Sequence, residues 1–218
     1  MVIGTAAEGP FQKNGYVLGC ERTKEAVYID PGDEVEQLLA FIAGQGLNVT
    51  RILLTHAHVD HVSGVAEAKR RLKAPICLHR ADQSLYDYAS KQGAMFGIQV
   101  EQPPPVDHYY ADRERISFGD YVADVHHTPG HAPGGVCLAV TKAGETGAPA
   151  LFAGDNLFAG SIGRTDLPGG DYNVLMKAIT EVLFAFPDES IVYSGHGPAT
   201  TIGRERRTNP FVLEYLEQ

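Results

Sequence analysis

Short apolar runs alternate with segments of helical periodicity along the first part of the chain. Apolar runs of strand length lie at residues 15–20, 25–30, 51–54 and 75–78, with polar or turn-forming residues between them. Residues 33–43 and 63–72 instead have an apolar and a polar face at helical spacing. This alternation of strands and helices is typical of an α/β protein.

The second half of the chain repeats the pattern with more strands. Strand-like runs lie at residues 115–118, 121–127, 136–141, 150–153 and 191–194, and residues 173–184 have the apolar spacing of a helix. Because each half contains strands with a helix among them, we expect two sheets packed face to face with helices outside. A length of 218 residues favours one domain over residues 1–218.

Residues 84–112 differ from the segments on either side. They include a Gly-Ala-Met-Phe-Gly stretch at 93–97 and three consecutive prolines at 103–105, and they predict a poor core element. Two interpretations stay open at this point, a surface lid and a plain connecting loop.

Composition narrows the functional classes. No run of about 18 apolar residues is present, so no membrane-spanning helix is expected, and the N-terminal residues lack the pattern of a secretory signal. The three cysteines, Cys20, Cys77 and Cys137, lie singly in strand-like runs, which favours core positions and a cytoplasmic location. The net charge of −9 argues against a nucleic-acid partner.

One ten-residue stretch is unusually rich in histidine. Residues 55–64 read THAHVDHVSG and contain His56, His58, Asp60 and His61. Imidazole and carboxylate groups are ligands that zinc and similar divalent metals prefer. Taken alone, the stretch is either a polar surface turn or one wall of a metal site.

Three further side chains of the same chemistry follow strand ends. His131, Asp155 and His196 each come just after a predicted strand and next to or near glycine. Strand ends project side chains from a rigid scaffold, and glycine lets the backbone turn sharply near an ion. Any one of these residues alone is most simply a solvated turn residue. Together, five histidines and two aspartates are enough ligands for a site of two metal ions.

These residues carry a family resemblance. The motifs THAHVDH, TPGHAPGG, AGD and SGHG, in this order, resemble the metallo-β-lactamase superfamily. The resemblance implies a four-layer αββα sandwich with two mixed sheets. It also implies two groups of metal ligands that share Asp155: the first consists of His56, His58, His131 and Asp155, and the second of Asp60, His61, His196 and Asp155.

A narrower resemblance indicates a reaction. Residues 154–171, 195–201 and 209–211 resemble the short bacterial glyoxalase II-like proteins. This resemblance implies hydrolysis of a small-molecule thioester, such as S-D-lactoylglutathione, by a metal-activated hydroxide, with Asp60 as the catalytic residue that orients it. We expect Asp30 and Thr55 to orient the imidazoles, although Asp30 could instead cap the helix at 33–43.

The chain departs from the longer glyoxalase II proteins in two respects. Only about twenty residues follow His196, so no C-terminal helical substrate domain is expected. Arg164 takes the place of a lysine that contacts glutathione in that family, and Asp166 takes the place of a tyrosine. We therefore predict Arg164 as a substrate-binding residue, while dependence on glutathione stays open.

Two alternatives remain. The Gly-Arg-Thr-Asp run at 163–166 also resembles the persulfide dioxygenases, in which one iron would be held by His56, His131 and Asp155 and would act on glutathione persulfide. A metal-binding module without catalytic activity is the other. For the hydrolase we expect two divalent ions, with zinc as the first choice and iron or manganese as alternatives set by supply. The sequence makes no prediction of oligomeric state.

Overall fold

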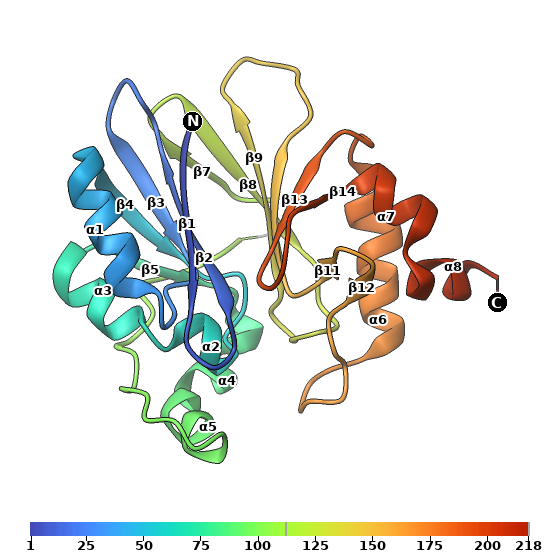
Figure 1. Ribbon diagram of the computed structural model, residues 1–218, viewed down its shortest axis with the longest axis horizontal. Helices are drawn as coiled ribbons and strands as arrows, with labels where there is room; N and C mark the ends of the chain where they lie inside the picture. Colours follow the sequence, from blue (N-terminus) through green and yellow to red (C-terminus); the bar gives the residue numbers. More distant parts are fainter. Residues whose placement is uncertain (112, 218) are drawn as a thin grey trace.

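Two six-stranded sheets lie face to face in the computed structural model, with helices on their outer sides (Figure 1). The structure describes residues 1–111 and 113–217. The strand order is β1-β2-β3-β4-β5-β6 in the first sheet and β14-β13-β10-β9-β8-β7 in the second, and β11 and β12 form a small separate ribbon. The expected α/β class and the four-layer αββα sandwich are confirmed.

The first sheet is half antiparallel and half parallel. Its strands are β1 (Val2–Glu8), β2 (Lys13–Gly19), β3 (Glu25–Ile29), β4 (Asn48–Leu53), β5 (Ile76–Leu78) and β6 (His108–Tyr109). The first three strands run antiparallel, whereas β3 to β6 run parallel. Parallel neighbours need crossover connections, which here contain α1 (Val35–Gln45), the short α2 (Val59–Val62) and α3 (Val65–Leu72).

The second sheet contains most of the later strands. They are β7 (Arg115–Phe118), β8 (Tyr121–His127), β9 (Val136–Lys142), β10 (Ala150–Gly154), β13 (Ile191–Ser194) and β14 (Thr200–Thr201). Only β10 and β13 pair in parallel within this sheet, and the crossover between them carries β11 (Leu157–Phe158), β12 (Ser161–Ile162) and α6 (Tyr172–Lys177). The two final helices, α7 (Ile202–Thr208) and α8 (Pro210–Leu216), follow β14.

Alternating side chains build three buried layers. Because successive residues of a strand point to opposite faces, Leu18 packs between the two sheets while its neighbour Val17 packs toward α1. The inner layer includes Leu138 and Phe152 from the second sheet. Leu151, the neighbour of Phe152, belongs to the outer layer under α6 to α8. Strands buried on both faces explain the apolar runs of the sequence.

The segment before residue 112 is more ordered than its sequence suggested. It contains a 3₁₀ turn at Arg80–Asp82, α4 (Gln83–Asp87), α5 (Ala89–Met95) and the edge strand β6. Tyr86 and Ala89 are buried in the core, so the prediction of a poor core element is wrong here. These helices were not predicted because helices of one or two turns are too short to show periodicity.

Two further differences concern a strand that was not predicted and a helix that changes its type along its length. The strand β1 was not predicted, because its residues lack a clear apolar run. The helix expected at residues 173–184 begins as α6 and continues as a π-helical turn (Ala178–Val182) and a 3₁₀ turn (Leu183–Ala185). That residues 1–218 make up one domain stays a prediction.

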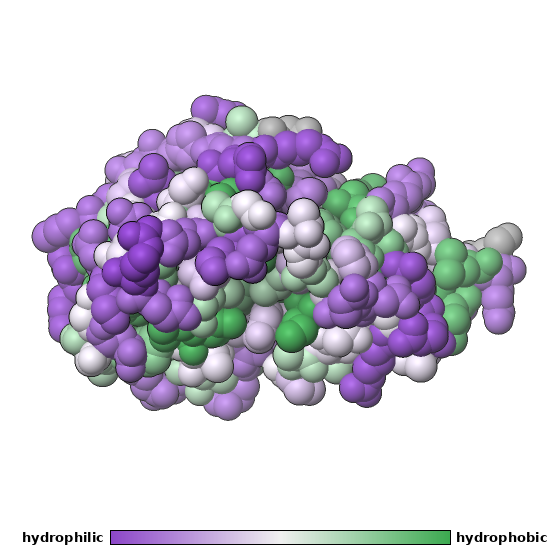
Figure 2. Space-filling view, turned by 90° about the horizontal axis from the view of Figure 1, so that it is seen from above, coloured by the Kyte–Doolittle hydropathy of each residue, from purple (hydrophilic) through white to green (hydrophobic). Residues whose placement is uncertain are grey.

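The outer surface is mainly hydrophilic in the view from above (Figure 2). Hydrophobic side chains gather at the end of the molecule where α8 lies, and the exposed apolar residues of that helix are Phe211, Leu213 and Leu216. Within the described residues, none of the helices has the length and apolarity needed to span a membrane.

Candidate metal centre

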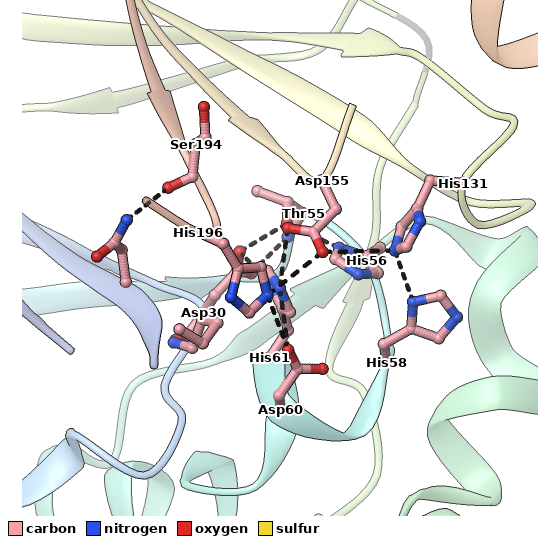
Figure 3. Close-up of polar contacts among 12 residues, drawn as sticks. Asp30, Thr55, His56, His58, Asp60, His61, His131, Asp155, Ser194 and His196 are labelled. Carbon is pink, nitrogen blue, oxygen red and sulfur yellow. Dashed lines mark hydrogen bonds and ion pairs between the residues drawn. The ribbon is translucent and has the colours of Figure 1, made fainter. Parts of the chain in front are cut away.

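The seven predicted ligands converge at one edge of the sandwich, where strands of both sheets end (Figure 3). Four of them, His56, His58, Asp60 and His61, follow β4, and α2 begins within this group. The other three come from the second sheet: His131 follows β8, Asp155 follows β10 and His196 follows β13. Residues separated by more than a hundred positions are thus brought together by the parallel pairing of β10 with β13 and by the contact between the sheets.

Glycines let two of these strand ends approach closely. Gly154, directly before Asp155, has a φ of 50°, a conformation that side chains with a Cβ rarely adopt. Gly195, directly before His196, lies so near the cluster that a Cβ there would stand 2.1 Å from Asp155 Oδ1. The glycines of the AGD and SGHG motifs are therefore required by space and by backbone conformation.

Among the described residues, three overlapping groups of ligand atoms could each hold a metal ion, and one of them, His56, His61 and Asp155, joins the other two. His56, His58 and His131 form the first group, and His58 Nδ1 lies 2.8 Å from His131 Nε2. Asp60, His61 and His196 form the second group, in which Asp60 Oδ2 lies 3.1 Å from His196 Nε2.

Asp155 stands between the two groups. Its Oδ1 lies 3.3 Å from His61 Nε2, and its Oδ2 lies 3.4 Å from His196 Nε2 and 3.6 Å from His131 Nε2. One carboxylate oxygen therefore faces ligands of both groups, as a bridging ligand would. The structure brings all seven predicted ligands together, and their division into two sets stays a prediction.

Unsatisfied ring nitrogens indicate that the cluster fits metal. The Nε2 atoms of His56 and His61 are buried and have no hydrogen-bond partner. A buried polar atom without a partner costs free energy, which a bound cation would recover. Imidazole nitrogens with carboxylate oxygens are also the donor set expected for zinc or iron. The described residues thus fit the divalent ions that the sequence predicted.

Hydrogen bonds from neighbouring groups fix the orientation of the imidazoles. Asp30 Oδ2 lies 2.9 Å from His61 Nδ1 and accepts a bond of 2.6 Å from the Thr55 hydroxyl, while Asp30 Oδ1 accepts from the Thr55 amide at 2.7 Å. The expectation that Asp30 and Thr55 support the ligands is confirmed. Asp30 does not cap α1, whose N-cap residue is Glu34.

Backbone carbonyls fix two further rings. His131 Nδ1 donates to the carbonyl of Arg164 at 2.8 Å, and His196 Nδ1 donates to the carbonyl of Phe11 at 3.0 Å. A carbonyl only accepts, so both rings carry the proton on Nδ1 and keep Nε2 free to bind a metal. This is the tautomer that the cluster requires.

A buried carboxylate, which the sequence analysis missed, joins two ligand loops. Asp82 is fully buried and accepts from the backbone amides of Ala57 and Gly134. Ala57 lies between His56 and His58, and Gly134 lies close to His131, so Asp82 links both sides of the first group. Burial raises the pKa of Asp82 to about 6. No motif surrounds this residue, and nothing in the sequence distinguished it from a surface aspartate.

A buried ion pair supports the other side of the cluster. Lys13 and Glu34 lie 3.1 Å apart and are almost wholly buried. Lys13 Nζ also donates to the carbonyl of Asp30, and Glu34 accepts from the amide of Gly32 at 2.9 Å. The pair thereby holds the turn in which Asp30 adopts a φ of 51°. A single lysine in a strand gave no sign of this role.

Electrostatics divide the imidazoles into two kinds. Burial lowers the pKa of His56 well below its usual value and the pKa of His58 to about 3, so both rings are neutral. Burial acts in the same direction on His61, but Asp155, Asp60 and Asp30 outweigh it and raise the pKa of His61 to about 10. Three carboxylates thus lie near the second group, where they favour a positively charged imidazole.

A cavity of about 360 Å³ opens onto the cluster. Five of the seven predicted ligands reach it, namely His58, Asp60, His131, Asp155 and His196. Arg164, predicted to bind substrate, also lines this cavity, and its guanidinium makes two bonds to the carboxylate of Asp166, at 2.8 and 2.7 Å.

Comparison with known proteins agrees with this geometry. Residues 9–196 match the family model described as the metallo-beta-lactamase superfamily. The chain is 36% identical to "Probable metallo-hydrolase YqgX" of Bacillus subtilis, with 94% of each chain covered. It is 35% identical to "Hydroxyacylglutathione hydrolase GloC" of Haemophilus influenzae, with 93% of each covered.

Solved structures show the same fold. The BLEG-1 B3 metallo-beta-lactamase superimposes with a TM-score of 0.86 at 37% identity, covering 97% of this chain and 99% of that one. TTHA1623 in a di-iron-bound form gives 0.84 at 41% identity, covering 95% and 99%. ETHE1 from Myxococcus xanthus gives 0.78 at 25% identity, covering 100% and 91%. The chain belongs to the metallo-beta-lactamase superfamily, and it is a metallo-hydrolase by family.

Proposed function

We propose that the protein hydrolyses small-molecule acyl thioesters, with S-D-lactoylglutathione as the reference substrate. The observation that carries the proposal is the pair of complete ligand groups with Asp155 between them, beneath an open cavity. Similarity to the GloC hydroxyacylglutathione hydrolase over nearly the whole chain supports the choice of a thioester.

The proposed ligands are those the motifs implied. His56, His58, His131 and Asp155 would hold one ion, and Asp60, His61, His196 and Asp155 the other. Two such ions, zinc by preference, supply a polarised carbonyl and a water of lowered pKa. Similarity to TTHA1623, solved in a di-iron-bound form, supports two ions and keeps iron as an alternative.

The chain's own groups position the reactants. In this proposal Asp60 accepts a hydrogen bond from the attacking water and orients it, and its position in the cavity lining beside His196 supports that role. Asp30, through His61, keeps the second group in place. The thiol of the substrate can leave as a thiolate because thiols have a pKa of about 8.5, so the reaction needs no general acid.

The test combines metal analysis with a thioester assay. The purified protein should contain two ions per chain and release free thiol from S-D-lactoylglutathione. His56→Ala and Asp155→Ala should each lower kcat/KM by at least about a thousandfold while the circular dichroism spectrum stays unchanged. His108→Ala is the matched control, because His108 is exposed and pairs with Glu114 away from the cavity. Full turnover in the His56 and Asp155 variants without bound metal would refute the proposal.

A persulfide dioxygenase is the alternative that similarity to ETHE1 favours. It would use one iron held by His56, His131 and Asp155, and would leave Asp60, His61 and His196 without a metal. All three of these residues are in place, which supports the hydrolase. One iron per chain and oxygen uptake with glutathione persulfide, without thioester turnover, would establish the alternative.

A β-lactam substrate is a second alternative, favoured by the similarity to BLEG-1. Asp155 counts against this alternative, because antibiotic-degrading members of the superfamily often have a cysteine at that position. Penicillin and carbapenem hydrolysis, followed by absorbance on the same metal-loaded sample, distinguishes the two activities. A kcat/KM for a β-lactam above that for every thioester would reassign the function.

A further inference from the structure

The cavity above the cluster has an apolar wall. Apart from the predicted ligands, most of its lining is hydrophobic: Phe11, Val59, Phe96, Phe158, Ile162 and Leu167. These side chains come from both halves of the molecule. Figure 1 shows the β1–β2 turn and α5 on the side of the first sheet, and β11 and β12 on the side of the second.

Two phenylalanines close one side of the cavity. Phe11 lies in the β1–β2 turn and Phe96 directly follows α5, and their rings meet edge to face with centroids 5.5 Å apart. Gln92 of α5 accepts a hydrogen bond of 2.6 Å from the amide of Val59, at the start of α2. This contact ties α5 to the ligand segment and keeps Phe96 at the cavity, although the residue as a whole is 48% exposed.

The same cavity offers little to a charged ligand. Among the described residues that line it, Arg164 is the one Lys or Arg side chain, and its charge is matched by the two bonds to Asp166. Glutathione carries two carboxylates, which would need cationic partners to leave water. An uncharged apolar group can enter this space without such partners.

We propose that this cavity binds an apolar acyl group, aliphatic or aromatic, of a thioester substrate, and that the thiol portion stays in solvent. The inference rests on the thioester hydrolysis proposed above and narrows its substrate class. Phe11, Phe96 and Phe158 are the residues that determine specificity. A cavity of 360 Å³ has room for a chain of six to eight carbons or a phenyl ring, and pockets of this size commonly bury most of a small ligand.

The experiment compares two series of thioesters on the metal-loaded protein. In the first series, the thiol is N-acetylcysteamine and the acyl group is acetyl, D-lactoyl, butanoyl, hexanoyl or phenylacetyl. In the second, the acyl group is hexanoyl and the thiol is N-acetylcysteamine or glutathione. We expect kcat/KM to rise about threefold for each added methylene, and so about tenfold from butanoyl to hexanoyl. Changing the thiol should alter it less than threefold.

Variants then test the wall. Phe96→Ala should lower kcat/KM for the hexanoyl thioester by about tenfold and leave the acetyl thioester within twofold. Met95→Ala is the matched control, because Met95 is 75% exposed, precedes Phe96 and does not line the cavity. Calorimetric titration with hexanoate and D-lactate adds a readout without turnover. The parent protein should bind hexanoate at least tenfold more tightly than D-lactate, and Phe96→Ala should lose this difference.

The outcomes separate this inference from the function beneath it. A protein that turns over thioesters but prefers D-lactoyl to hexanoyl, or responds more to the thiol than to the acyl group, overturns the inference and leaves thioester hydrolysis standing. Equal loss for acetyl and hexanoyl in Phe96→Ala also overturns it. A protein that turns over neither S-D-lactoylglutathione nor any thioester of either series refutes the proposed function and this inference with it.

Discussion

Replacement of Asp30 by asparagine should weaken the second metal ion selectively. The carboxylate of Asp30 is 2% exposed and receives three donors. Its Oδ1 accepts from the Thr55 amide at 2.7 Å, and its Oδ2 receives the Thr55 hydroxyl at 2.6 Å and faces His61 Nδ1 at 2.9 Å. An asparagine offers one oxygen and one NH₂ group to these three donors, so in either orientation at least one donor faces another.

This conflict sets the expected magnitude. One buried donor left unpaired costs about 1–3 kcal/mol of folding free energy. The bond to His61 Nδ1 also weakens, because a neutral amide replaces a carboxylate, and outer partners of this kind change metal affinity by about 10–100-fold. We therefore expect Asp30→Asn to raise the Kd of the second ion about 10–100-fold and leave the first ion nearly unchanged. His58, a proposed ligand of the first ion, makes no hydrogen bond to Asp30, and His56 is linked to Asp30 only indirectly, through the Thr55 hydroxyl 3.2 Å from its Nδ1.

The assay is a zinc titration of metal-free protein against a chromogenic chelator, which resolves both dissociation constants. Asp33→Asn is the control, because Asp33 lies in the same turn and accepts only from the Ser63 hydroxyl, at 2.8 Å. Urea unfolding of the metal-free proteins measures the folding cost separately. Wild-type affinity for both ions in Asp30→Asn would refute the reasoning. Equal loss of both ions would show that Asp30 does not act through His61 alone.

Three further predictions concern the surroundings of the cluster. Lys13→Met leaves Glu34 buried without its cation and should lower the free energy of unfolding by about 3–5 kcal/mol. Adding Glu34→Gln should restore most of this loss, because no uncompensated buried charge is left. A double variant that is no more stable in urea than Lys13→Met would contradict this prediction. Burial raises the pKa of Asp82 from 3.8 to about 6, so folding favours the protonated carboxyl. The stability that Asp82 adds relative to Asp82→Asn should therefore be present below pH 3.8 and lost as the pH rises through about 6. Urea unfolding of both proteins across this range checks this, and a constant difference between them would argue against it. Asp166→Asn should free Arg164 and lower KM for S-D-lactoylglutathione by up to about fivefold at unchanged kcat, and an unchanged KM would show that Arg164 does not reach a substrate carboxylate.

The clustering of the seven predicted ligands could be anticipated because each of them belongs to a local signal in the sequence. Every one follows a strand end, and glycines at positions such as 154 and 195 mark the sharp turns that such a site needs. The two-sheet arrangement was predictable for the same reason, since strands buried on both faces leave unbroken apolar runs. Helices α4 and α5 left no such trace, because they are anchored by single residues such as Tyr86 rather than by a periodic face.

The supporting residues were not predictable because their meaning depends on distant partners. Asp82 bonds to Gly134, 52 positions away, and Lys13 pairs with Glu34, 21 positions away. In the sequence, each is an ordinary charged residue, and the prior for such a residue is exposure. Only the fold places them in the interior, where an unpaired charge would be costly and where their bonds hold the ligand loops.

The cavity wall and the metal cluster are connected through the backbone of two residues. Phe11 places its ring against Phe96 at the cavity, and its carbonyl accepts from His196. Arg164 also lines the cavity with its side chain, and its carbonyl accepts from His131. Each residue therefore orients a predicted ligand with its main chain and lines the cavity with its side chain. Since a substitution exchanges the side chain and keeps the carbonyl, specificity at these positions can change while the imidazoles stay in place. A Phe11→Ala variant should accordingly keep both metal ions and lose the preference for an apolar acyl group.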